Sequence, residues 1–281
     1  MAQVDFTRIA SNIGALNALN ALRNVNNNLA LHQTRLATGK RINSAMDDPA
    51  GLTIANKLNA RNEGMKTALS NIGDAKNMLS VAESGLTKIN GILTKMRNLA
   101  QQGINDTLGK DERQAIMDQM EEYESQIKDT ITQTTWNGKD LVSNADNYTF
   151  QTGADSGDVT TFTAISLTAV TASGVGLDLS VTLDSTDAST FSSYMGKVDS
   201  AIDTISGKLS NVGALMSKLT FKEEQLAVSQ VNVEGAYNRI MNADMAQEQL
   251  EATKYSILQQ TSITMLAQAN AAPQGILSLF R

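Results

Sequence analysis

The 281-residue chain has no cysteine, two prolines and one histidine, and aromatic residues make up only 4% of it. Without cysteine it can form neither a disulfide framework nor a thiolate metal site. Two prolines suit long uninterrupted helices, and few aromatic rings argue against one thick core. The composition therefore favours extended helical packing over a compact globular enzyme.

Long hydrophobic runs are missing as well. No apolar stretch approaches the roughly 18 residues that a membrane-spanning helix needs. The segment MAQVDFTRIASN at the N-terminus lacks the apolar centre of a cleavable signal peptide. If the protein works outside the cell, we expect it to leave by a route that does not read such a signal.

Positive charge is absent from residues 143–192, which contain no Lys or Arg but six Asp. This segment accounts for the whole net charge of −6, because the other 231 residues carry 23 positive and 23 negative side chains. Alternating apolar residues at 148–152 and 160–164, around the glycines of 153–157, predict a β-hairpin, and 175–183 predicts a further strand. We expect a small β-rich segment exposed to solvent.

Side chains suited to catalysis or metal binding are scarce. His32 lies on the apolar stripe of a helix without the partners of a catalytic triad, so we interpret it as a packed helix residue. Asp47 and Asp48 could form a metal or acid–base pair, but their position before Pro49 favours helix capping. Residues 1–46 carry a net charge of +4 without interleaved aromatics, which does not favour nucleic-acid binding. We expect no enzyme, no cofactor and no metal site.

The most regular feature of the chain is an apolar repeat every seven residues. One seam comprises Met65, Ile72, Leu79, Leu86, Leu93 and Ala100, and the second comprises Ala68, Ala75, Ala82, Ile89 and Met96. A matching repeat near the other end comprises Val198, Ile205, Val212, Leu219, Leu226, Val233 and Ile240, with Ile202, Leu209 and Met216 beside it. A repeat of five heptads predicts a helix about 54 Å long that is packed lengthwise on a partner helix.

Further helices flank these two. A helix is predicted from Pro49 to about residue 61. The long heptad helix follows it and ends at about residue 102, before a turn at 103–109. Another helix is expected at 110–132, and helices resume at about 190–237. Between them, Trp136-Asn137-Gly138-Lys139 predicts a type I′ turn, because Asn-Gly tolerates positive φ at both central positions.

Both ends of the chain are predicted to be helical and to need a partner. The helix at 6–36 has one apolar stripe, with Ile9, Ile13 and Leu16 out of phase with it, and seven asparagines between 12 and 28 make it marginal in isolation. It should stop at Gly39. The apolar side of a last helix at 242–271 comprises Leu250, Ile257, Leu258, Met265 and Leu266. We expect residues 272–275 to break this helix before an apolar patch that includes Leu277 and Phe280.

Three separated stretches resemble the signatures of bacterial flagellins. TGKRINSAMDDPAG at 38–51 is similar to the N-terminal signature of that family. ADMA at 243–246 and MLAQANAAPQGIL at 265–277 are similar to its closing signature, and NVGA at 211–214 fits an internal region. The resemblance covers about 1–142 and 193–281, with the motifs in the expected order.

The resemblance implies a mainly α fold of long antiparallel coiled-coil-like helices, with paired terminal helices and a small outer β-hairpin region. It implies an inner filament-core domain of residues 1–43 and 241–281 and a rod domain of 44–142 and 193–240. The segment 143–192 would then form the variable surface. Subunit contacts would be made by the apolar residues of the ends: Ile9, Ile13, Leu16, Leu22, Leu29, Ile257, Leu258, Leu266, Leu277 and Phe280.

The implied function is that of a structural subunit that polymerises head-to-tail into the extracellular flagellar filament for swimming. The implied partners are copies of the chain itself, the flagellar cap and hook-junction proteins and a flagellin export chaperone, and the implied route is the flagellar export apparatus without a cleavable signal. No nucleic acid or membrane partner is expected. The alternatives are a hook–filament junction protein, which shares the terminal helices, and a soluble coiled-coil adaptor.

The resemblance also implies a contact with the vertebrate Toll-like receptor, which flagellins make through a basic, an apolar and an acidic residue on the rod helices. Lys95 stands where the family motif has Arg, and Leu99 matches its Leu. Counting back from Trp136, Gln119 stands where the motif has Glu. Because Lys lacks the planar fork of Arg and Gln lacks the charge of Glu, we expect weakened recognition.

Overall fold

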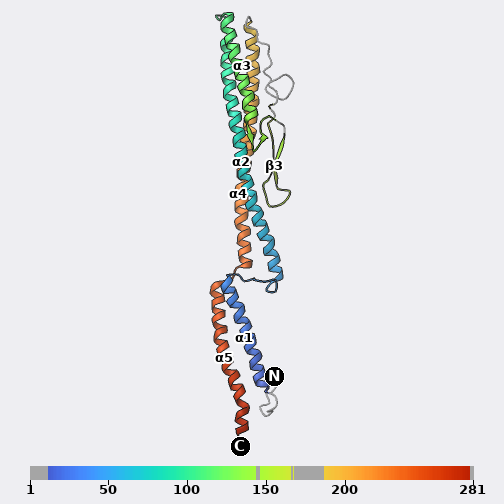
Figure 1. Cartoon of the computed structure of the whole chain (residues 1–281), viewed down its shortest axis with the longest axis vertical. Coiled ribbons are helices and arrows are strands. Elements are labelled where there is room, and N and C mark those ends of the chain that lie inside the picture. Colours follow the sequence, from blue (N-terminus) through green and yellow to red (C-terminus); the bar gives the residue numbers. More distant parts are fainter. Residues whose placement is uncertain (1–11, 144–145, 166, 168–186, 279–281) are drawn as a thin grey trace. The chain divides into compact units, whose positions relative to one another are not determined.

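The computed structural model describes residues 12–143, 146–165, 167 and 187–278. Within these ranges the chain forms five helices and two antiparallel strand pairs (Figure 1). The elements are α1 (Ile13–Thr38), α2 (Pro49–Gly103), α3 (Lys110–Gln133), β1 (Thr135–Trp136), β2 (Lys139–Asp140), β3 (Asn147–Gln151), β4 (Val159–Thr163), α4 (Ala188–Met241) and α5 (Met245–Ser278). The predicted mainly α fold with a small hairpin region is confirmed. The strand expected at 175–183 lies outside the described residues.

The chain divides into two compact units. The terminal unit comprises Met1–Ala60 and Asn232–Arg281, and the central unit comprises Arg61–Val231. Helices α2 and α4 contribute residues to both units. The boundaries of the three filament domains expected from the sequence stay a prediction.

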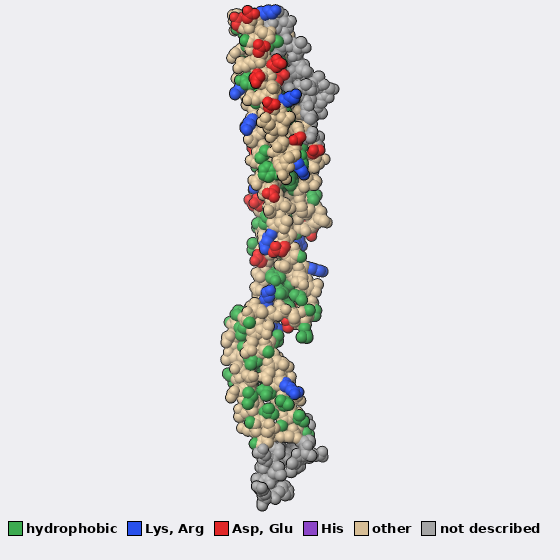
Figure 2. All heavy atoms as spheres, in the orientation of Figure 1, with side chains coloured by type: hydrophobic (Ala, Val, Ile, Leu, Met, Phe, Trp, Pro, Cys, Tyr) green, Lys and Arg blue, Asp and Glu red, His purple; other side chains and the backbone are tan. Residues whose placement is uncertain are grey.

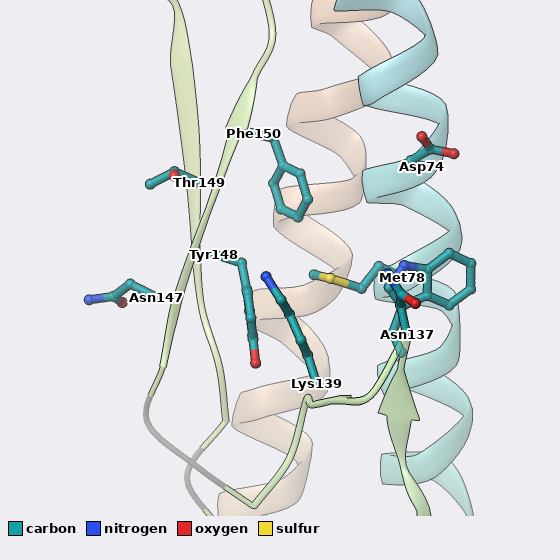
Figure 3. Close-up of a pocket in the computed structure, with 9 residues that line it drawn as sticks. Asp74, Met78, Asn137, Lys139, Asn147, Tyr148, Thr149 and Phe150 are labelled. Carbon is teal, nitrogen blue, oxygen red and sulfur yellow. The ribbon is translucent and has the colours of Figure 1, made fainter.

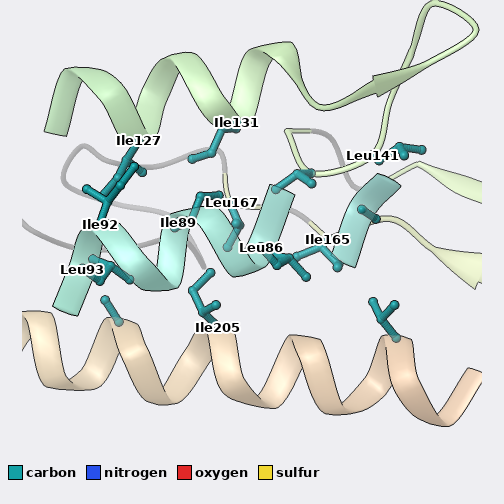
Figure 4. Close-up of a cluster of buried hydrophobic side chains, with 14 of the residues drawn as sticks. Leu86, Ile89, Ile92, Leu93, Ile127, Ile131, Leu141, Ile165, Leu167 and Ile205 are labelled. Atoms are coloured by element: carbon teal, nitrogen blue, oxygen red, sulfur yellow. The ribbon is translucent and has the colours of Figure 1, made fainter. Parts of the chain in front are cut away.

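The core of the central unit follows the heptad repeat. All eleven predicted seam residues of α2 are at most 1% exposed, and the α4 seam residues from Val198 to Leu219 are buried as well. Figure 4 shows α2 between α3 and α4, with its leucines and isoleucines directed toward both neighbours. Ion pairs of Lys76 with Glu223 (2.9 Å) and Arg97 with Asp199 (2.6 Å) show that α2 and α4 run antiparallel.

The turn between α2 and α3 is held by one buried arginine. Arg113 is 8% exposed. Its guanidinium donates hydrogen bonds to the carbonyl oxygens of Gly103 (3.1 Å) and Asn105 (3.2 Å) and lies 3.5 Å from Asp106. It thereby satisfies the carbonyl of the last residue of α2 and fixes the turn that follows.

A polar contact joins α3 to α4 inside the apolar core. The hydroxyl of Tyr194 donates a hydrogen bond of 2.5 Å to Oε1 of Glu124. Burial raises the pKa of Tyr194 far above its usual value, and burial also raises the pKa of Glu124. The phenol therefore remains a hydrogen-bond donor across the physiological pH range.

The strand pairs confirm the predicted turns. Asn137 and Gly138 have φ angles of 49° and 73°, which are the positive values that a type I′ turn requires. In the larger hairpin, β3 pairs with β4 in a register that places Tyr148 opposite Phe162 and Phe150 opposite Thr160. The rings of Tyr148 and Phe162 stack with their centroids 6.3 Å apart.

Two helix boundaries differ from the expected ones. Helix α2 is continuous through residues 61–65, because Gly64 lowers helix stability by only about 1 kcal/mol and does not end a helix. Helix α5 continues through Pro273 to Ser278, so the break expected at 272–275 is wrong. A single proline removes one hydrogen bond and can bend a helix without ending it.

Two glycines of α2 offer a matched test of how closely α2 packs against the end of α3. A Cβ at Gly85 would lie 2.6 Å from Oγ1 of Thr134, a buried side chain, whereas a Cβ at Gly91 would meet nothing within 4 Å. We expect Gly91→Ala to stabilise the fold by about 0.5–1 kcal/mol through helix propensity. Gly85→Ala should destabilise it by about 1 kcal/mol, because the clash outweighs the same gain. Chemical denaturation measures both, and equal stabilisation by the two variants would contradict the close approach.

Candidate assembly interface

The two ends of the described chain meet in one antiparallel helix pair, α1 with α5 (Figure 1). The side-chain amide of Asn12 donates a hydrogen bond of 2.8 Å to the carbonyl of Ala269 near the far end of the pair. Nε2 of Gln259 donates to Oδ1 of Asn26 at 2.8 Å in the middle of the pair. The pairing predicted for the chain ends is therefore present within a single chain.

A buried carboxylate joins these two helices near the start of α5. Glu248 is 9% exposed. Its Oε2 lies 2.5 Å from Nδ1 of His32, and its Oε1 accepts a hydrogen bond of 3.3 Å from Arg35. The imidazole also stacks on Tyr255, with centroids 5.3 Å apart. His32 is thus a packed helix residue, as its place on the stripe predicted.

Backbone hydrogen bonds tie the two connecting segments together. The N–H of Arg41 donates to the carbonyl of Met241 (2.7 Å), and the N–H of Ala243 donates to the carbonyl of Gly39 (3.0 Å). The guanidinium of Arg41 donates to the carbonyl of Ile240 as well. Gly39 has a φ of 69°, so α1 ends in the left-handed conformation that its sequence predicted.

The paired aspartates before α2 have structural roles. Oδ1 of Asp48 accepts a hydrogen bond of 2.8 Å from the N–H of Gly51, which is the geometry of a helix N-cap. Asp47 accepts hydrogen bonds from the backbone N–H groups of Asn43 and Ser44, and these bonds hold its pKa below the usual value. The capping interpretation is therefore confirmed, with Asp48 as the cap.

The side chains between α1 and α5 are mainly aliphatic on α1 and a mixture of small, polar and aromatic residues on α5. The covered face of α1 comprises Ala15, Ala18, Leu22, Val25, Leu29, His32 and Leu36. The covered face of α5 comprises Glu248, Ala252, Tyr255, Gln259, Ser262, Leu266 and Ala269. The pair thus joins the predicted aliphatic stripe of α1 to a face of α5 on which alanine and polar residues are common.

Large apolar side chains remain exposed on the same two helices. The exposed set comprises Ile13 (48%), Leu16 (58%), Met245 (47%), Leu250 (64%), Ile257 (64%), Leu258 (39%), Ile263 (47%) and Met265 (58%). Figure 2 shows the green hydrophobic side chains that gather over these helices on one face. Such an exposed apolar surface marks an interaction site.

Charge is nearly absent from this surface. The two helices carry five charged side chains, and none follows Lys254 within α5. Glu248 pairs with Arg35, and Glu251 lies 3.1 Å from Lys254. Depletion of charge with enrichment of large apolar side chains is typical of the buried centre of a protein–protein interface.

The structure separates the predicted subunit-contact residues into two groups. Ile13, Leu16, Ile257 and Leu258 lie on the open surface, whereas Leu22, Leu29 and Leu266 lie on the faces covered within the pair. Ile9, Leu277 and Phe280 lie outside the described side chains. Which of them contact a neighbouring copy stays a prediction.

The residues predicted for receptor recognition lie on α2 and α3. Lys95 and Leu99 are one turn apart on α2, the first exposed and the second packed against the core. The ammonium of Lys95 lies 5.8 Å from the ring centroid of Tyr123 on α3. Gln119 is exposed one turn before Tyr123, so the three predicted residues lie on neighbouring helices of the central unit.

The described residues contain neither a candidate metal cluster nor a candidate membrane-spanning helix. No cluster of three or more His, Asp or Glu side chains could hold a metal ion within the ranges that the structure describes. Among the helices in those ranges, none has the length and apolarity needed to cross a membrane.

Sequence reasoning did not identify the group around Glu248. The available signal was a carboxylate near the start of a helix that carries few charges, together with the only histidine of the chain. Arg41, whose guanidinium holds the end of α4, was also missed, although it lies within the stretch that resembles the N-terminal signature.

Known proteins resemble the chain along most of its length. Residues 9–147 match the bacterial flagellin N-terminal helical region, and residues 195–280 match the bacterial flagellin C-terminal helical region. The flagellin of Halalkalibacterium halodurans is 34% identical over 95% of this chain and 98% of its own length. The flagellin of Bacillus subtilis is 33% identical over 98% of this chain and 100% of its own.

A solved structure shares the fold. It is a Vibrio parahaemolyticus protein assigned as flagellar hook-associated, with a TM-score of 0.60 and 16% identity over 70% of this chain and 100% of that chain. At this identity the likeness concerns the fold alone.

Paired terminal helices with an apolar, charge-poor outer surface define a structural protein that assembles with other chains. The two matched regions and the near full-length relatives show that the chain belongs to the bacterial flagellin family. It is a structural subunit of the extracellular flagellar filament, which polymerises with copies of itself and serves motility. The matches to both flagellin regions decide for this function over the junction protein and the adaptor.

Glu248 offers a test of the α1–α5 pair. Glu248→Ala leaves His32 and Arg35 without their buried partner, which we expect to weaken the pair by about 2 kcal/mol. The critical concentration for seeded polymerisation should therefore rise about tenfold or more. Glu251→Ala, which removes only an exposed pair with Lys254, is the matched control and should change it little. The role of the buried carboxylate is refuted if the two variants polymerise alike.

Proposed function

We propose that polymerisation couples the folding of the chain ends to association. The flagellar export apparatus delivers the chain unfolded, without a cleavable signal, to the distal end of the filament. Helices α1 and α5 then become ordered as neighbouring copies bury their apolar surface. Monomers remain soluble until they meet the growing end, because ordering these helices alone is unfavourable.

The observation that carries this proposal is the exposed apolar surface of α1 and α5. Ile257 is 64% exposed and Leu16 is 58% exposed on helices that carry few charges. The asparagines of α1 and the alanine and polar residues on the covered face of α5 limit the stability of an isolated pair. Burial by a second copy supplies what a single chain lacks, at about 1.5–3 kcal/mol for each large apolar side chain.

The filament contacts are head-to-tail and do not close, which is the condition for an open helical polymer. Residues 1–43 and 241–281 form its inner layer, and residues 44–142 and 193–240 form the next layer. The acidic segment 143–192 faces outward, in keeping with its lack of positive charge. A thin filament surface without large outer domains follows from the small size of this segment.

Other partners follow from the same role. We infer contacts with the flagellar cap at the growing end, with hook-junction proteins at the base and with an export chaperone before secretion. The chaperone would shield the apolar ends that a neighbouring copy covers later. We also infer that the role is purely structural, without catalytic activity.

The test uses the purified chain and filament seeds at neutral pH. The full chain should form tubular filaments under negative-stain microscopy. Deletion of 273–281, or removal of 1–43 and 241–281, should leave a helical central part that does not polymerise. Normal filaments from the deleted chains would falsify the proposal.

A point variant complements the deletions. Ile257→Asn places a polar group on the exposed apolar surface of α5 and should reduce seeded polymerisation at least about tenfold. Thr253→Asn, one turn earlier and already polar and exposed, is its matched control and should polymerise normally. Equal polymerisation of both variants would show that the surface of α5 around Ile257 is not part of the interface.

We further propose that the Toll-like receptor of a vertebrate host recognises this chain weakly through Lys95, Leu99 and Gln119. The double variant Lys95→Arg, Gln119→Glu restores a planar guanidinium and a charge-assisted hydrogen bond, so we expect reporter-cell activation at about tenfold lower concentration. Lys88→Arg, an exposed change on the same helix, is the control. A wild-type response as strong as that to a potent flagellin would contradict the proposal.

A further inference from the structure

The central unit has an exposed apolar surface of its own, separate from α1 and α5. Phe221 (68% exposed), Val228 (63%) and Val231 (70%) lie on α4, and we call them the α4 stripe. Leu219, two residues before Phe221, is fully buried in the seam with α2. Because two residues span about 200° of an α-helix, Phe221 points away from α2.

A pocket of about 310 Å³ lies on another face of the same unit, between the β3–β4 hairpin and α2. Met78, Trp136, Tyr148 and Phe150 contribute apolar and aromatic walls. The ammonium of Lys139 lies 5.5 Å from the ring centroid of Tyr148. Figure 3 shows the side chains of Tyr148, Phe150, Lys139 and Met78 directed toward one another, and we call this site the hairpin pocket.

The two surfaces lie at a similar level of the central unit but on different faces. Lys76 of α2 pairs with Glu223 of α4, two residues after Phe221. Asp74, which lines the hairpin pocket, precedes Lys76 by two residues and so lies on the opposite side of α2 from α4. One chain therefore cannot place its own α4 stripe in its own hairpin pocket.

We propose that the α4 stripe of one copy docks into the hairpin pocket of a second copy, with Phe221 as the inserted side chain. The inference rests on the proposed polymerisation, but it requires nothing of α1 or α5. An apolar knob on one face and an aromatic pocket on another form a heterologous contact, which propagates without closing. The occupant is a second copy because the chain belongs to the flagellin family and polymerises with copies of itself.

One charged side chain beside each surface complements the other. Lys218 is exposed about one turn before Phe221, and Asp74 is exposed at the rim of the hairpin pocket. Opposite charges at the rim of an apolar contact guide association and fix its register. Aromatic anchors in such pockets dominate the stability of many interfaces.

The first experiment measures the critical concentration for seeded polymerisation of the full chain. Phe221→Ala should raise it about tenfold or more, because the buried ring is lost from every contact. Val159→Ala truncates another exposed apolar residue, outside both surfaces, and should leave it unchanged. The thermal unfolding of both monomers should match that of the wild type, since both side chains are exposed. Wild-type polymerisation of Phe221→Ala overturns the proposal.

The second experiment identifies the contact directly and benefits from the lack of native cysteine. Filaments are grown from a mixture of Phe221→Cys and Lys139→Cys chains and treated with a short bismaleimide. We expect a two-chain product from the mixture, and none from filaments of either variant alone or from mixed monomers. Cross-linking of Phe221→Cys filaments alone would show a self-complementary contact and overturn the proposal. Absence of the two-chain product from mixed filaments would also overturn the proposal.

These outcomes are separable from a failure of the proposed function. If the wild-type chain does not polymerise on seeds, coupled folding and association fails before the stripe is tested. If wild-type filaments form while Phe221→Ala polymerises like the wild type, or while the mixed filaments give no cross-link, only the contact between the α4 stripe and the hairpin pocket is refuted.

Discussion

The antiparallel packing of α2 against α4 is the interaction on which the other features of the fold depend. In the central unit it buries the whole predicted seam of α2 and gives α3 and the β-hairpin a surface to cover. In the terminal unit the start of α2 and the end of α4 pack through Ile42, Ala55 and Met241. Because the two helices run in opposite directions, the segments beside them meet, and the N–H of Ala243 donates a hydrogen bond to the carbonyl of Gly39. The helices at the two ends of the chain can then pair, although they are distant in the sequence.

The chain assigns different side chains to contacts within one copy and contacts between copies. The central unit buries most of its large apolar residues, with the α4 stripe as an exception, and carries ion pairs such as Lys76 with Glu223 on its surface. Helix α5 differs, since alanine and polar groups form much of its face against α1 while Leu250, Ile257 and Met265 face outward. A subunit that must stay soluble alone and still polymerise needs both arrangements. The stable unit supplies a folded body, and the apolar ends supply the drive to associate.

Sequence periodicity was sufficient for the helices and hairpin and insufficient for the interface. The heptads from Met65 to Ala100, the turn at Asn137 and the end of α1 at Gly39 all followed from local rules. The pattern could not tell which face of α5 meets α1, because an apolar stripe is equally suited to a partner helix and to a second copy. Pairwise contacts such as that of Glu248 depend on register between distant segments, which no local pattern fixes.

Amide hydrogen exchange of the full chain, compared between monomer and seeded filament, tests the central claim most directly. The account predicts rapid exchange in α1 and α5 of the monomer and strong protection of the same amides in the filament. The amides of α2 between Ile72 and Ala100 should be protected in both states, because the seam with α4 is complete in one chain. Strong protection of α1 and α5 in the monomer, unchanged by polymerisation, would show that the ends fold without neighbours and would contradict the account.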